Sequence, residues 1–244
     1  MSRPIVYFFT DFGAQGPYLG LMETALLRHA PQARVIHLVS DAPAFSPKPS
    51  AYLLGALVPW LAPGSVLVGV VDPGVGTARK ALLLEAGGRR FIGPDNGLFA
   101  ALMKNREARA WEIVQDPAEL SATFHGRDLF APAAGRLAGG GKLELQSIPL
   151  QQLVGADWPR QLAEIIYIDH YGNAMSGLRA DAFSPDTVFR LGDLLLSRHD
   201  TFADVPPGDA FWYENSLGLV EIAVNLGRCD TTLGIRVGTA IESA

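Results

Sequence analysis

Cysteine is nearly absent from this sequence, since Cys229 is the only one among 244 residues. A lone cysteine cannot close a disulfide within its own chain, and it cannot supply the thiolates of a structural zinc site. Such low cysteine usage is compatible with a cytoplasmic location, which we expect. The amino-terminal segment agrees with this expectation, because its short apolar run ends at Asp11 and no signal-peptide cleavage site follows.

Basic clusters and long apolar runs are lacking as well. Lys and Arg together number 20 against 25 Asp and Glu, and the formal net charge is −5. An acidic chain without a basic stripe is not expected to bind nucleic acid. No apolar stretch approaches the roughly 20 residues that span a bilayer, so no membrane partner is expected. The 5 histidines are scattered singly, without the spacing of metal ligands, and we expect no metal site.

Several common catalytic motifs are missing. The chain has neither the lysine-containing phosphate loop nor the G-x-G-x-x-G dinucleotide motif. It also lacks the G-x-S-x-G elbow that presents the nucleophile of many serine hydrolases. These absences argue against a P-loop nucleotidase, a Rossmann dehydrogenase and a serine hydrolase.

Residues 1–146 alternate between strand-like and helix-like segments. Buried strands are predicted by three apolar runs, at 4–9, 34–39 and 65–71. Helical spacing of apolar residues predicts two helices, at 18–30 and 50–61. Strands that alternate with helices predict an α/β domain with a largely parallel central sheet. A hairpin around Gly87 and Gly88 and a helix over 127–137 complete this predicted N-terminal domain.

The pattern changes after residue 146. Residues 147–161 are irregular and contain 2 prolines, so we expect a linker there. Residues 162–244 hold short strand-like runs that are separated by Gly, Pro, Asn and Asp. This pattern is typical of a small all-β, barrel-like domain, so the sequence predicts two domains of different class.

Three carboxylates come shortly after predicted parallel strands: Asp11, Asp41 and Asp72. Ligands of open α/β sheets bind outside the carboxyl ends of the strands, so these side chains are candidates for one crevice. An aspartate after a strand also caps a helix or forms a turn. For Asp41, which is far from any Gly-rich turn, we favour that structural role.

Two further segments of the N-terminal half concentrate polar side chains. In VVDPGVGTAR, residues 70–79, glycines free the backbone to approach a ligand, and Arg79 follows Asp72. In TFHGRDLFAP, His125 stands beside a predicted helix start. Asp128 in the first turn complements the helix dipole, but this explanation does not account for His125.

The predicted β domain carries polar residues in its turns, namely Asp169, Asn173, Asn215 and Ser216. Turns favour these residue types for structural reasons, so each residue alone indicates no function.

Six segments occur in one order along nearly the whole chain: TDFG, VVDPGVGTAR, GPDNGLF, TFHGRDLFAP, IDHYGNAMSG and NSLGLVEIAVNLG. In this order and spacing, the chain resembles the S-adenosyl-L-methionine (SAM) hydrolases, also called SAM hydroxide adenosyltransferases, which are relatives of fluorinases and chlorinases. The resemblance implies an α/β N-terminal domain, a barrel-like C-terminal domain and a homotrimer. It also implies active sites between the N-terminal domain of one subunit and the C-terminal domain of the next.

The resemblance implies that Asp72, Arg79 and His125 handle the attacking water in the hydrolysis of SAM to adenosine and L-methionine. The sulfonium already makes methionine a good leaving group, so the reaction at the ribose 5′ carbon needs a better nucleophile and no general acid. Arg79 would stabilise the developing hydroxide, and His125 and Asp72 would orient the attacking water or take its proton. SAM is then the substrate, and no cofactor is expected.

Substrate contacts are implied in the N-terminal domain by the same resemblance. Asp11 would accept hydrogen bonds from both ribose hydroxyls. Tyr18 would contact the methionine end of SAM.

The resemblance also implies contacts from the C-terminal domain. Asp169 would pair with the α-ammonium group, and Asn173 would read the adenine edge. Ser216 would donate to the α-carboxylate, together with backbone amides, because position 217 is Leu where some halogenating relatives have Arg. Phe202 is the expected aromatic side chain that stacks on the adenine ring.

Alternative functions remain open at this point. A non-catalytic SAM or adenosine sensor would use the same pocket without turnover, and a SAM-dependent halogenase would replace water by halide. The presence of Asp72, Arg79 and His125 disfavours both, and the short segment after Arg79 lacks the extra loop of the halogenases. A purely structural trimer would leave the clustered polar turns unexplained.

Overall fold

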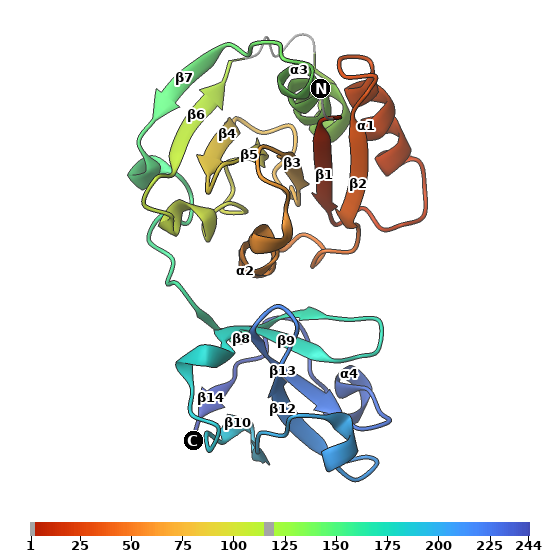
Figure 1. The fold of residues 1–244 in the computed structure, drawn as a ribbon, viewed down its shortest axis with the longest axis vertical. Helices are drawn as coiled ribbons and strands as arrows, with labels where there is room; N and C mark the ends of the chain where they lie inside the picture. The colour runs from red at the N-terminus through yellow and green to blue at the C-terminus, as the bar shows by residue number, and fades with distance from the viewer. Residues whose placement is uncertain (1–2, 115–119) are drawn as a thin grey trace. The chain divides into compact units, whose positions relative to one another are not determined.

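The computed structural model describes residues 3–114 and 120–244 and is drawn as a ribbon in Figure 1. It divides into two compact units, Met1–Trp158 and Pro159–Ala244. The division falls within the segment 147–161 that was expected to be a linker. The first residues of that segment, Ser147 and Ile148, belong to a strand of the first unit.

A 7-stranded sheet forms the centre of the first unit, in the order β2-β1-β3-β5-β4-β6-β7. The strands are β1 (Ile5–Thr10), β2 (Arg34–Val39), β3 (Val66–Val70), β4 (Ala81–Ala86), β5 (Arg89–Pro94), β6 (Arg109–Ile113) and β7 (Leu145–Ile148). Strands β2, β1, β3 and β5 are parallel, while β4, β6 and β7 add antiparallel pairs. The predicted parallel centre and the β4–β5 hairpin are confirmed.

The helices of the first unit are α1 (Tyr18–Leu27), α2 (Pro47–Leu57), a π-helical turn at Gly126–Phe130 and α3 (Ala131–Ala138). Helix α2 begins earlier than expected, because Pro47 is tolerated in the first helical turn. Short 3-10 turns lie at Val58–Trp60, Leu102–Lys104 and Leu150–Gln152. The helix predicted over 127–137 is therefore present, but its first turn is wider than an α-helix.

The core of the first unit joins α1, α3 and the sheet. Strand β3 is buried along its whole length, as expected for a central parallel strand with both faces covered. Leu26 of α1, Phe130 and Val68 of β3 belong to one cluster of buried side chains. This packing fixes the carboxyl ends of β1 and β3, where the polar loops begin.

The second unit is built from antiparallel strands, as the sequence predicts. One sheet of 4 strands has the order β12-β13-β9-β8, and another of 3 strands has the order β11-β10-β14. The strands are β8 (Leu162–Ile168), β9 (Ala174–Arg179), β10 (Phe189–Leu191), β11 (Leu194–Leu196), β12 (Ala210–Glu214), β13 (Leu219–Val224) and β14 (Glu242–Ser243). A short helix α4 (Cys229–Thr232) and 3-10 turns at Ala180–Ala182 and Phe202–Asp204 complete it.

The core of the second unit has Trp212 at its centre. Trp212 is fully buried, and its ring meets that of Phe189 edge-on at a centroid distance of 5.0 Å. Cys229 is buried in the same cluster, and burial raises the pKa of its thiol to about 12. Among the described residues, no helix is long and apolar enough to cross a membrane.

Candidate active site

The carboxyl ends of β1 and β3 bring two carboxylates to the same edge of the first unit's sheet. Thr10 and Val70, the last residues of these strands, are paired in the parallel register. Asp11 and Asp72 follow them and line one pocket of about 380 Å³, together with Tyr18 and His125. The crevice expected from Asp11 and Asp72 therefore exists, and Asp41 does not line it.

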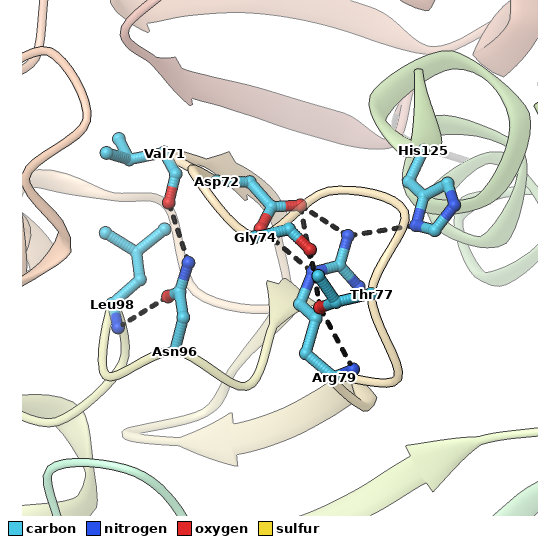
Figure 2. A network of polar contacts seen from close by, with 8 residues as sticks. All are labelled: Val71, Asp72, Gly74, Thr77, Arg79, Asn96, Leu98 and His125. Carbon is cyan, nitrogen blue, oxygen red and sulfur yellow. Dashed lines mark hydrogen bonds and ion pairs between the residues drawn. The ribbon is translucent and has the colours of Figure 1, made fainter. Parts of the chain in front are cut away.

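Asp72 and Arg79 form a buried ion pair at this edge (Figure 2). Nε of Arg79 donates to both carboxylate oxygens of Asp72 at 2.9 Å, and Nη2 donates to Oδ2 as well. The Asp72 and Arg79 side chains are only 4% and 9% exposed. A carboxylate buried to this extent is stable only with such a partner, so each charge depends on the other.

The tight turn between Asp72 and Arg79 brings the Arg79 side chain back to the Asp72 carboxylate. The Thr77 hydroxyl donates to the Gly74 carbonyl at 2.7 Å. Gly76 has a φ of +80°, and a Cβ at this position would overlap the carbonyl oxygen of Ala122. Only glycine fits at position 76.

Asn96, from the segment GPDNGLF, braces the strand end that precedes Asp72. Its Nδ2 donates to the Val71 carbonyl at 2.8 Å, and its Oδ1 accepts from the Leu98 N–H at 3.2 Å (Figure 2). Gly97 has a φ of +93° and lies against the Trp158 ring. The segment therefore forms a tight turn and also holds the backbone beside Asp72.

His125 lies on the far side of the Arg79 guanidinium from Asp72 (Figure 2). Its Nδ1 is 2.9 Å from Nη2 of Arg79. Arginine can only donate, so Nδ1 accepts, and the proton of the neutral ring is on Nε2. Burial, and then the nearby charge of Arg79, lower the pKa of His125 below 6.5, which favours this neutral state.

The π-helical turn positions His125. His125 directly precedes Gly126–Phe130, and a Cβ on Gly126 would press on Met22 and Phe124. The ring of Phe130 lies 5.2 Å from the Arg79 guanidinium carbon, so this turn supports the arginine too. Asp128 lies in the first turn, as expected, and accepts from Arg127 at 2.6 Å.

Asp11 contacts a strained residue at the rim of the same pocket. Its Oδ2 accepts from the Phe45 N–H at 3.0 Å. Burial raises the pKa of Asp11, and the charge of Asp72 adds to this, although the Phe45 hydrogen bond opposes it. Phe45 lines the pocket and is 77% exposed, and its φ of +56° is a costly backbone conformation for this residue.

Aromatic rings form one wall of this pocket. Tyr18 meets Phe124 edge-on at 5.4 Å, and Phe12 lies 5.7 Å from Tyr18. Three further lining residues were not predicted from the sequence: Phe12, Phe45 and Phe124. Phe12 and Phe124 directly adjoin Asp11 and His125 in the sequence, and this adjacency was the available signal.

The second unit has a pocket of its own, with a volume of about 800 Å³. Every site residue predicted in this unit lines it: Asp169, Asn173, Phe202 and Ser216. Asp169 Oδ1 accepts from the Asn173 backbone N–H at 2.9 Å, which ties the two polar residues into one turn.

Phe202 has an available ring surface beside this pocket. Its edge-on contacts are with Phe211 at 5.2 Å and Tyr213 at 5.6 Å, and 38% of the residue is exposed. Leu226, another lining residue, is 87% exposed with a φ of +54°. Phe45 and Leu226 are the two non-glycine residues with positive φ in the described part of the chain, and each lines a pocket.

The floor of the second pocket includes three residues that were not predicted as site residues: Tyr213, Asn215 and Glu221. Asn215 was noted only as a turn residue. Glu221 is 2% exposed and accepts hydrogen bonds from Tyr213 and Asn215. A glutamate inside the apolar run LVEIAV was the signal in the sequence.

The two pockets differ in what they can do chemically. The first unit carries a buried chain of carboxylate, guanidinium and neutral imidazole, which suits the orientation of a small polar reactant. The second carries a carboxylate, amides, a hydroxyl and aromatic rings, which suit a polar ligand with a flat ring. Within residues 3–114 and 120–244, no group of three or more His, Cys, Asp and Glu could hold a metal ion, and the absence of a metal cofactor remains a prediction.

Comparisons with known proteins agree with the resemblance seen in the sequence. Family models of the SAM hydroxide adenosyltransferase N-terminal and C-terminal domains match residues 6–147 and 163–242. An (R)-S-adenosyl-L-methionine hydrolase of Salinispora arenicola is 38% identical, over 99% of this chain and 98% of its own. One of Thermus thermophilus is 35% identical, over 98% of this chain and 99% of its own.

Solved structures share the whole fold. The crystal structure of a conserved hypothetical protein from Thermus thermophilus has a TM-score of 0.81 and 34% identity, and the match covers 100% of both chains. A conserved protein from Thermotoga maritima has a TM-score of 0.81 at 27% identity, over 98% of this chain and 99% of its own. The predicted two-part fold is thereby confirmed, and the chain belongs to the SAM hydroxide adenosyltransferase family.

Proposed function

We propose that this protein hydrolyses (R)-S-adenosyl-L-methionine to adenosine and L-methionine by attack of water on the ribose 5′ carbon. The full-length relatives that carry the name of this hydrolase support the proposal. The observation that carries it is the buried contact of Arg79 with both Asp72 and His125 beside a pocket.

The leaving group requires no assistance in this reaction. When the bond from carbon to the sulfonium breaks, sulfur takes the electron pair and methionine leaves as a neutral thioether. Water is a weak nucleophile, so the enzyme must hold it in line with that bond and favour the loss of its proton.

Arg79 supplies positive charge close to the proposed water site. Asp72 and His125 hold its guanidinium, and the site is partly desolvated, so the charge acts more strongly than in bulk water. We infer that this charge stabilises the developing hydroxide.

His125 has a narrower role than a general base. Its Nδ1 accepts from Arg79, so the remaining ring nitrogen, Nε2, carries hydrogen and donates. We infer that this N–H orients the oxygen of the attacking water. Asp72 is then the proposed acceptor for a water hydrogen, because its Oδ1 accepts only one hydrogen bond from Arg79 and keeps a second lone pair.

Substrate recognition divides between the two pockets in this proposal. In the first unit, Asp11 binds the ribose hydroxyls and Tyr18 contacts the methionine portion. In the second unit, the contacts proposed are Asp169 to the α-ammonium, Ser216 to the α-carboxylate, Asn173 to the adenine edge and Phe202 to its face. The lining of the two pockets by these side chains supports the assignment.

We further propose a homotrimer in which complete sites use residues from neighbouring subunits. Each unit has a pocket with part of the predicted set, and neither pocket alone carries both catalytic and adenine-binding residues. Action in the cytoplasm without a cofactor belongs to the same proposal.

Product analysis tests the activity. Purified protein is incubated with (R)-SAM and a chelator in water enriched in a heavy oxygen isotope. The products are then separated by chromatography and analysed by mass spectrometry. Adenosine that carries the label in its 5′ hydroxyl, with an equal amount of unlabelled methionine, is the expected result. SAM that is bound and recovered unchanged would support the sensor instead, and a halogenated nucleoside formed in the presence of halide would support the halogenase.

A further inference from the structure

Glu221 is a carboxylate in the middle of a buried strand. All residues of β13, Leu219–Val224, are buried, and the neighbours of Glu221 along the strand are apolar. In the antiparallel registers, Glu221 lies opposite Tyr213 on β12 and Met175 on β9. All three side chains line the pocket of the second unit, so Glu221 belongs to the floor of that pocket.

Hydrogen-bond donors converge on this carboxylate. The Tyr213 hydroxyl donates to Oε1, and Nδ2 of Asn215 donates to Oε2 at 2.6 Å. Burial, with a contribution from the charge of Asp169, raises the pKa of Glu221, while hydrogen bonds from Tyr213, Asn215 and the Asn173 side chain oppose the rise. An ionised carboxylate can accept from Tyr213 and Asn215 together, and an apolar side chain would leave both donors without this acceptor.

The contact with Glu221 fixes the orientation of the Asn215 amide. Its Nδ2 is directed to Glu221, so its Oδ1 faces the other way and accepts from the N–H groups of Leu217 and Leu219, at 2.9 and 3.0 Å. A flipped amide would place N–H against N–H at those two positions. Glu221 therefore defines the turn that contains Ser216.

The second amide, of Asn173, lies between two carboxylates. Its Nδ2 is 3.4 Å from Asp169 Oδ2, and interaction with its side chain also lowers the pKa of Glu221. The contact with Asp169 uses the N–H side of the amide, which leaves its oxygen as the group available to a ligand.

We propose that Glu221 is a positioning residue, which orients the Asn173 amide and the Ser216 turn for substrate without contacting the reacting atoms. This inference rests on the proposed function, since both groups are assigned to SAM recognition there. It predicts a defect in binding and not in chemistry, because Asp72, Arg79 and His125 belong to the other unit.

Three variants separate this role from general damage to the strand. In Glu221→Gln, the Tyr213 hydroxyl can turn and accept from the new amide, but the hydrogen bond from Asn215 becomes neutral and therefore weaker. In the double variant Asn215→Asp with Glu221→Gln, the donor and acceptor are exchanged. The new amide on β13 donates to the new carboxylate in the turn, which still accepts from Leu217 and Leu219. Glu214→Gln makes the same chemical change at the end of β12, at a residue that does not line the pocket.

We would measure steady-state rates with SAM, and the affinity for adenosine by calorimetry, for the parent protein and for all three variants. Glu221→Gln is expected to raise KM and weaken adenosine binding by about tenfold, with kcat within about threefold of the parent. The exchanged pair is expected to return KM to within about threefold of the parent, which a purely structural defect would not do. Glu214→Gln is expected to match the parent.

The outcomes distinguish the two proposals. If the parent turns over SAM but Glu221→Gln has parental KM and affinity, the positioning role is wrong and the hydrolase proposal stands. The same conclusion follows if the exchanged pair is folded, by circular dichroism, yet no better than the single variant. If the parent neither binds nor hydrolyses SAM, the hydrolase proposal fails, and this role for Glu221 fails with it.

Discussion

Arg79 Nη2 lies 2.9 Å from His125 Nδ1, and this contact fixes which nitrogen of the histidine ring carries the proton. A proton on Nδ1 would face the guanidinium, so protonation of His125 breaks the contact. The site is therefore organised only while His125 is neutral.

The pH dependence of the rate follows from this relationship. The pKa of His125 is lowered, by burial first and by Arg79 second, so the ring is neutral at neutral pH. We expect kcat to fall toward acid pH with a midpoint below the ordinary histidine value of 6.5. The free energy of unfolding changes with pH in the same direction as kcat. The contribution of neutral His125 is complete above pH 6.5, and it is lost as the pH falls through the lower pKa that His125 has in the folded state.

His125→Asn is the control for that prediction, since an amide oxygen can accept from Arg79 but does not titrate. In this variant, the remaining kcat should no longer fall toward acid pH as it does when His125 becomes protonated. An unchanged fall in kcat would assign the titration to another group, of which Asp11 is the first to consider, because its pKa is raised.

Arg79→Ala is expected to separate chemistry from binding. The arginine charge is proposed to act on the developing hydroxide, so its loss should lower kcat by about a hundredfold or more. Affinity for adenosine should remain within about tenfold of the parent. Steady-state rates and calorimetry decide this, and a variant that loses binding but keeps kcat would contradict the role given to Arg79.

The Asp72–Arg79 pair should be strongly coupled in stability. Removing either partner alone leaves a buried charge unpaired and is expected to cost about 3–5 kcal/mol of unfolding free energy. Removing both should cost less than the larger single effect, because no orphaned charge remains. Urea unfolding of Asp72→Ala, Arg79→Ala and the double variant at one protein concentration measures the coupling, and additive losses would contradict it.

Asp11→Ala should weaken recognition of the ribose. The proposed contacts to the hydroxyls exist as soon as substrate binds, so we expect adenosine affinity to fall by about tenfold or more. The parent should bind adenosine better than 2′,3′-dideoxyadenosine, and the variant should distinguish them much less. Equal discrimination in both proteins would remove Asp11 from ribose recognition.

A complementation experiment tests the shared sites of the proposed trimer. Asp72→Ala removes a proposed catalytic group, and Asp169→Ala removes the proposed ammonium contact in the other unit. Co-expressed in one cell, the two inactive chains should form mixed trimers in which some sites contain both native residues, so activity should return. Light scattering checks the mass, and mixed oligomers without recovered activity would show that each site uses a single chain.

The parallel half of the sheet was predictable because its strands are continuous apolar runs. Val66–Val70 is buried throughout, so local sequence alone marks it. The outer strands β6 and β7 were not predicted, since they have mixed burial and are defined by pairing with partners distant in sequence. The early start of α2 was missed because Pro47 stands among residues typical of loops, although a proline is favourable in a first turn.

The site was predictable where the chemistry lies in the segments themselves. Asp72, Arg79 and His125 were all named from the sequence, but the contact of Arg79 with His125 joins positions 46 residues apart and depends on tertiary packing. Glu221 was missed for the same physical reason. Its partners Tyr213 and Asn215 are reached across the β12–β13 hairpin, and only the register shows that they meet its side chain.

Phe45 and Leu226 set a limit on how this protein can be made more robust by design. Both adopt left-handed backbone conformations, with φ of 56° and 54°, that asparagine or glycine would occupy at lower cost. Replacing either residue by asparagine or glycine should raise the free energy of unfolding by an amount on the order of 1 kcal/mol. The same replacements would remove an exposed apolar side chain from the lining of each pocket. A screen for thermostability without an activity assay would therefore select variants with altered pockets.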